Sequence, residues 1–110
     1  MAGMSPIEIT RPSPAEFDPA AAGYIARAPV ISDASRQLHS QRDALVNVLS
    51  PLSDDRSDYR YAPQKWSIKE LLGHICDTER ILSYRLLRIG RGDATPLQGF
   101  DENAYAETAA

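Results

Sequence analysis

The strongest constraint on this chain is an apolar stripe at helical spacing between residues 68 and 89. Its members recur at steps of three, four and seven residues, which places them on one face of an α-helix. They are Ile68, Leu71, Leu72, Ile75, Leu82, Leu86 and Ile89. Ser67 and Glu70 have the spacing of a capping box at the start, and Trp66 can pack on Leu71 as a hydrophobic staple. We therefore predict a long helix that begins after Ser67 and ends at Gly90 or Gly92.

A second stripe lies between residues 34 and 52. Its apolar members are Ala34, Leu38, Leu45, Val48, Leu49 and Leu52. Ser32 or Asp33 can cap this helix, because a short side-chain oxygen accepts a free backbone N–H of the first turn. Pro51 ends it near Ser50, since proline cannot continue a helix. Two long helices thus make up most of the regular structure that we predict.

The remaining segments read as connections and as the start of another helix. The first 31 residues hold five of the eight prolines and predict an extended leader arm, with one short helical turn near residues 20–25. Residues 53–58 are polar and predict a solvated loop. Asp101 can cap a third helix. We therefore expect an all-α chain with a leader arm at residues 1–31 and part of a helical bundle at residues 32–110.

Composition narrows the partners and the compartment. The chain has 12 basic and 15 acidic residues, a net charge of −3, and no basic block, which argues against nucleic acid as a partner. No apolar run reaches the roughly 18 residues of a membrane span. The N-terminus lacks the pattern of a secretory signal, so we expect a cytoplasmic protein with no membrane partner. Cys76 is the single cysteine and has no partner for an internal disulfide.

His74 is the side chain most suited to chemistry, because it borders the apolar stripe of the second long helix. A neutral imidazole there can bind a divalent metal if a facing helix supplies further ligands. The alternative is a histidine satisfied by a carboxylate or by solvent. Glu70 and Asp77 lie one turn either side of His74, so either can accept a hydrogen bond from its ring. Alternatively, both carboxylates are solvated and pair with nearby basic residues.

Other polar residues give weaker indications. Glu79 falls within the apolar stripe, so we expect a buried hydrogen bond or ion pair there more than a catalytic role. Cys76 reads as a small packing residue, and His39 as solvent-exposed. The sequence contains no phosphate-binding loop and no nucleophile elbow. The catalytic residues are therefore unknown from the sequence.

Several motifs together resemble the DinB superfamily, and in particular its DinB-like domain proteins. The resemblance rests on the runs 59–75, 77–81, 91–93, 95–97 and 99–101, and extends weakly to 11–12 and 24–27. It implies a four-helix bundle with a long crossover and a divalent metal, Zn or Ni, near one end. In the family a histidine of the second helix and a pair of ligands on the fourth hold the metal, and His74 matches the former.

The resemblance also implies what this chain lacks. It ends where the family's third helix begins, so we expect a domain truncated after its second helix, with His74 as its one family ligand. We expect enzymatic chemistry only in the complete domain and none in this chain alone. Characterised relatives include metal-dependent transferases and isomerases that use low-molecular-weight thiols such as mycothiol or bacillithiol. A thiol is therefore an expected partner of the complete domain, while this chain alone is expected to bind no metal.

A second function class remains open from the sequence. Two helices leave part of each apolar stripe uncovered, and another helix must cover the rest. The chain could therefore be a non-catalytic helical module that self-associates as a homodimer or pairs with another helical chain. The coding sequence downstream of Ala110 would distinguish the two readings.

Overall fold

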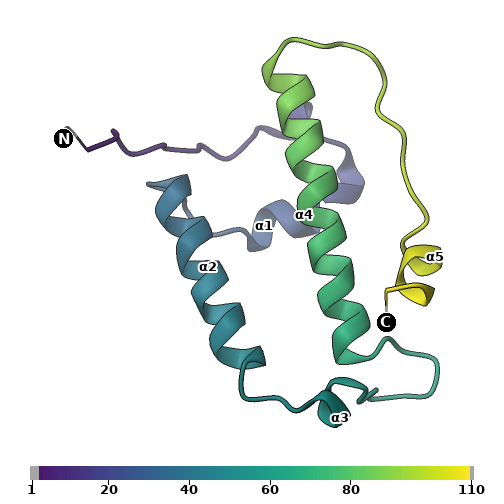
Figure 1. The fold of residues 1–110 in the computed structure, drawn as a ribbon. Helices are drawn as coiled ribbons and strands as arrows, with labels where there is room; N and C mark the ends of the chain where they lie inside the picture. The colour runs from purple at the N-terminus through teal and green to yellow at the C-terminus, as the bar shows by residue number, and fades with distance from the viewer. Residues whose placement is uncertain (1–2, 110) are drawn as a thin grey trace. The chain divides into compact units, whose positions relative to one another are not determined.

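The computed structural model describes residues 3–109, and within this range every named element is a helix (Figure 1). The chain divides into two compact units, Met1–Pro51 and Leu52–Ala110, which are described separately below. The prediction of an all-α chain is confirmed. The proposed division into a leader at residues 1–31 and a bundle domain at residues 32–110 stays a prediction.

The first unit consists of two 3-10 turns, η1 (Pro14–Glu16) and η2 (Pro19–Ala21), the short helix α1 (Ala22–Arg27) and the long helix α2 (Ala34–Leu49). The side chain of Asp33 accepts a hydrogen bond from the Ser35 N–H at 3.2 Å and caps α2. The helix ends at Leu49, two residues before Pro51, as the sequence predicts. The short helical turn expected near residues 20–25 is present as η2 and α1.

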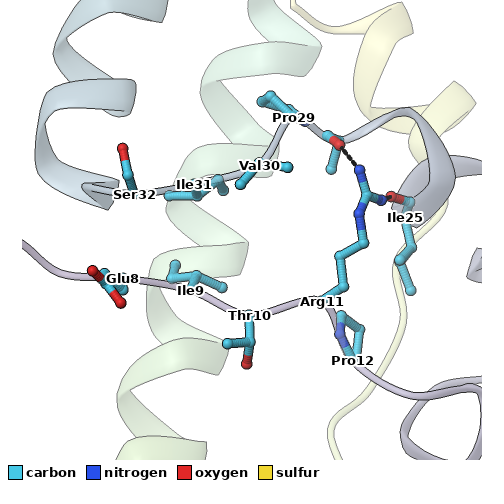
Figure 2. A pocket seen from close by; sticks show the side chains of 11 residues that line it. Glu8, Ile9, Thr10, Arg11, Pro12, Ile25, Pro29, Val30, Ile31 and Ser32 are labelled. Atoms are coloured by element: carbon cyan, nitrogen blue, oxygen red, sulfur yellow. Dashed lines mark hydrogen bonds between the residues drawn. The ribbon is translucent and has the colours of Figure 1, made fainter.

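The extended leader is tied to the rest of its unit by backbone and side-chain bonds. The Ile9 N–H donates to the Ile31 carbonyl at 3.1 Å, and the two residues form an isolated antiparallel bridge. The guanidinium of Arg11 donates to the carbonyls of Ile25 and Ala28 at the end of α1 (Figure 2). Carbonyls at a helix C-terminus lack intrahelical partners and favour a positive charge, so Arg11 caps α1 from a distance.

We expect Arg11→Gln to release the leader from α1, because glutamine cannot reach both carbonyls or supply the charge. The amide of Ile9 should exchange with solvent roughly tenfold faster, since one charged hydrogen bond contributes about that factor to local stability. Hydrogen exchange measured by NMR tests this. Arg27→Gln is the matched control, because it removes an arginine of α1 itself. Equal exchange rates in the two variants would show that Arg11 does not anchor the leader.

The second unit holds three helices, α3 (Asp54–Ser57), α4 (Ile68–Gly90) and α5 (Glu102–Glu107). The expected loop at residues 53–58 is wrong, because Asp54–Ser57 form one helical turn. The Ser53 hydroxyl accepts from the Arg56 N–H at 3.4 Å, and Asp54 and Asp55 lie in the first turn, where negative charge is favourable. A single turn has no apolar stripe, so periodicity could not reveal it.

Helix α4 ends as the sequence predicts. Gly92 has a φ of 72°, a left-handed conformation that glycine adopts without a Cβ clash. The Asp93 N–H donates back to the Arg88 carbonyl at 3.0 Å, which completes a Schellman-type end. The Arg88 side chain also donates to the Asp93 carboxylate at 2.8 Å, and this holds the pKa of Asp93 well below its usual range. The turn after α4 is therefore held by both backbone and charge.

Helix α5 packs on α4 through very small side chains. Ala106 is buried, at 3% exposure, and a Cβ placed on Gly73 would lie 2.8 Å from the Cβ of Ala109. The Asp101 side chain caps α5 by accepting from two backbone N–H groups at 3.1 Å, as the sequence predicts. The close approach of the residues directly after α5 to helix α4 therefore depends on the missing side chain at Gly73.

Candidate functional site around His74

The site is built on the N-terminus of α4, where a complete capping box fixes the first turn. The Glu70 N–H donates to the Ser67 hydroxyl at 3.2 Å, and the Ser67 N–H donates to the Glu70 carboxylate at 2.9 Å. Ser67 is 2% exposed, so its polar groups depend on these bonds. The capping box read from the sequence is therefore confirmed.

Arg60 adds an ion pair that the sequence did not reveal. Its Nη1 donates to Glu70 Oε2 at 2.6 Å and its Nη2 to Oε1 at 2.5 Å, a bidentate arrangement. The guanidinium of Arg60, followed by the Ser67 N–H, lowers the pKa of Glu70 to about 2. The same contact raises the pKa of Arg60. Glu70 is thus a fixed anion that joins the preceding segment to the helix.

The same arginine orders the segment before α4. Arg60 Nη1 also donates to the Lys65 carbonyl at 2.7 Å, and the Ile68 N–H donates to the Tyr59 carbonyl at 3.2 Å. Lys69 pairs with Asp58 at 2.8 Å, which raises the pKa of Lys69. The chain from residue 58 to residue 70 is therefore closed on itself by local bonds, and this fixes the position of Trp66.

Trp66 contacts His74 directly. The two ring centroids lie 4.9 Å apart at an interplanar angle of 51°, a tilted aromatic pair. Both residues are half-buried. The predicted staple of Trp66 on Leu71 stays a prediction, although both residues line one hollow. The indole thus limits the orientations that the imidazole of His74 can take.

The sequence offers Glu70 and Asp77 as hydrogen-bond acceptors for the ring of His74, and the structure treats the two differently. Glu70 is engaged by Arg60 and Ser67, so it is not placed as the hydrogen-bond partner of His74. Asp77 stays a candidate for that role, and its carboxylate lies 3.7 Å from Arg80. The hydroxyl of Thr78, one turn after His74, is buried and has no hydrogen-bond partner within residues 3–109.

The remaining sequence candidates lie on the surface. Glu79 is exposed, so the buried pairing expected for it is not seen in the second unit. Cys76 is exposed and not packed as a core residue. His39 is exposed, as predicted, with its Nδ1 2.7 Å from the Ser35 carbonyl oxygen.

The donor set around His74 does not by itself fit a metal ion. Within the described part of the chain, no three His, Cys, Asp or Glu side chains form a group that could hold one. A stable protein site for Zn²⁺ or a similar ion uses three or four protein ligands. His74 is the one candidate ligand that the sequence names in this part of the chain, and its role stays a prediction.

Two further findings bear on the class of protein. Among the helices of residues 3–109, none combines the length and the apolar character that a membrane crossing needs. Comparison with curated proteins and with solved structures found no match.

The family comparison gives a positive result. The model of the DinB superfamily matches residues 37–110, which is more than half of the chain and includes α4, its capping box and His74. This confirms the resemblance inferred from the motifs around residues 59–75. The chain belongs to the DinB superfamily.

Proposed function

We propose that this DinB-like domain takes part in binding a divalent metal, Zn²⁺ or Ni²⁺, with the imidazole of His74 as one ligand. The observation that carries the proposal is the placement of His74, half-buried against Trp66 and about two turns after a helix start that Ser67 and Glu70 fix. A ligand held in one orientation loses little entropy on binding. His74 is therefore prepared for coordination.

The buried hydroxyl of Thr78 supports the same placement. It lies one turn from His74 on neighbouring faces of α4, and a buried polar group without a partner calls for a water or a bound group. Ligands on a facing helix would complete the metal's coordination. If such a metal were bound, it would supply a Lewis acid for a low-molecular-weight thiol, as thiol-dependent transferases require. The role of this chain would be to hold His74 in place.

We further propose that another helical chain, in the first instance a second copy, covers the apolar side of α4. The elements of the second unit leave Leu82, Leu86 and Ile89 largely exposed. Exposed aliphatic side chains at helical spacing are typical of a helix–helix interface. A homodimer in which the two α4 helices pair in parallel would also bring two copies of His74 to the same end. This arrangement supports the alternative function of a helical pairing module as well.

Metal content and mass are measured on the same sample to test these proposals. The 110-residue chain is incubated with Zn²⁺ or Ni²⁺, separated by size with light scattering, and analysed for metal. We expect no tightly held metal in a species of monomer mass, 12.1 kDa, because one imidazole cannot hold it. Metal in a dimer should be lost in His74→Ala and retained in the control His39→Ala.

The outcomes distinguish the proposal that His74 is a metal ligand from the proposal that another chain covers α4. Metal that His74→Ala retains would show that His74 is not the ligand. One metal per monomer that is lost in His74→Ala would support His74 as a ligand. The same result would contradict the expectation that a monomer with one imidazole cannot hold a metal tightly. A monomer at all concentrations would contradict pairing through α4.

A further inference from the structure

A hollow of about 600 Å³ lies beside the start of α4, and His74 is not among the residues that line it. Its walls come from the segment before the helix, from the first turn of α4 and from α5, and they include Tyr59, Tyr61, Lys65, Trp66 and Asn103. Its volume lies in the range of small-molecule sites, roughly 300–1,000 Å³. All of these elements belong to the second unit.

Three aromatic side chains line this hollow, and two of them are strongly exposed. Tyr59 is 63% exposed and Tyr61 is 73% exposed, while Trp66 is half-buried. Exposed aromatic rings around a concavity favour a planar ligand, because rings stack on rings at low entropic cost. The backbone beneath them is fixed by Arg60, which bonds both Glu70 and the Lys65 carbonyl. The hollow is therefore held in shape without a ligand.

The charge in the hollow is positive. Lys65 is the one basic residue that lines the hollow. Two nearby basic residues are already paired with carboxylates, Arg60 with Glu70 and Lys69 with Asp58. Within residues 3–109 no carboxylate lies within ion-pair distance of the Lys65 ammonium. The residues that line the hollow include no carboxylate. An anionic group on the ligand would find one free cation there, and the amide of Asn103 can hydrogen-bond to the same ligand.

We propose that this hollow is a binding site for a small planar aromatic anion, such as an aromatic carboxylate. The rings of Tyr59, Tyr61 and Trp66 stack on the ligand, and Lys65 pairs with its negative group. The site does not depend on a metal at His74. Because Trp66 also contacts His74, a molecule bound here would lie next to the proposed metal ligand.

The single tryptophan of the chain allows a local test. With EDTA present, the indole N–H signal of Trp66 is followed by NMR as 1-naphthoate is added. We expect a saturable shift, and a roughly tenfold weaker response to 1-naphthylmethylammonium, which has the ring but the opposite charge. Cyclohexanecarboxylate, which has the charge without the aromatic ring, should also bind roughly tenfold more weakly.

Two surface variants assign the binding to the hollow. Lys65→Gln and Tyr61→Leu should each weaken 1-naphthoate binding roughly fivefold to tenfold. Their controls are Arg91→Gln, which removes a positive charge beyond the end of α4, and Tyr24→Leu, which removes an exposed tyrosine of the first unit. A circular dichroism spectrum of each variant verifies folding.

Several results would overturn the proposal. They are no saturable shift at up to roughly 10 mM naphthoate, equal affinity for the naphthyl cation, or equal effects of the test and control variants. Because the titration is metal-free, none of these results depends on whether His74 binds a metal. A failure of metal binding would likewise leave this site intact.

Discussion

Replacing Glu70 with glutamine is expected to remove a large part of the acid sensitivity of the second unit. In the folded chain the pKa of Glu70 is lowered to about 2 from an ordinary value of 4.5, because its carboxylate pairs with Arg60 and accepts the Ser67 N–H. The unfolded chain therefore binds the proton first as the pH falls. A lowered carboxyl pKa contributes stability that is complete above about pH 4.5 and lost as the pH falls toward 2.

Urea unfolding followed by circular dichroism at several pH values measures this dependence. The unmodified chain should lose stability steeply between about pH 4.5 and 2, whereas Glu70→Gln should be less stable at neutral pH and show a flatter dependence. Glu79→Gln is the matched control, because Glu79 is an exposed glutamate of the same helix. The acid response that remains should come from Asp93, whose pKa is lowered by Arg88. The same pH dependence in both variants would contradict the role of the Arg60–Glu70 pair.

Replacing Gly73 with leucine is expected to detach α5 from α4. A Cβ alone at this position would lie 2.8 Å from the Cβ of Ala109, closer than two carbon atoms can approach, and leucine adds three more carbons. Overpacking of this kind costs about 1–3 kcal/mol, which is enough to undock a six-residue helix. Amide exchange within α5 and the exposure of Ala106 are the measurements.

Gly90→Leu provides the control for Gly73→Leu. Both substitutions replace glycine by leucine in α4, but a Cβ at Gly90 meets no atom within 4 Å. We expect Gly90→Leu to leave the protection of α5 unchanged and to strengthen the end of α4 by up to about 1 kcal/mol. If α5 were protected equally in both variants, close packing at Gly73 would not hold it.

The elements that the sequence predicts well are those set by local rules. Ser67 and Asp101 cap their helices because a cap involves only residues two or three positions apart. The apolar stripe and the glycines after residue 89 define α4 for the same reason. The motifs around His74 identify the DinB superfamily, which helical periodicity alone could not identify.

The features that the sequence did not predict depend on side-chain direction. Arg60 lies in an irregular segment, so no periodicity indicates that its guanidinium reaches Glu70. Glu70 therefore appeared free to contact His74. The ring contact between Trp66 and His74 links positions eight residues apart, one of them before the helix begins. Gly73 could have indicated close packing, because a glycine within a strong helix costs stability unless another element approaches it.

The bonds that shape the site also determine when it can form during folding. Arg60 and Glu70 are ten residues apart, and Tyr59 bonds Ile68 across a similar distance. Loops of about ten residues close in roughly 10–100 ns, and their closure costs little entropy compared with contacts between distant helices. Folds rich in such near-sequence contacts cross their barriers quickly. The surroundings of His74 can therefore be assembled early in folding, before contacts between helices that are distant in the sequence form.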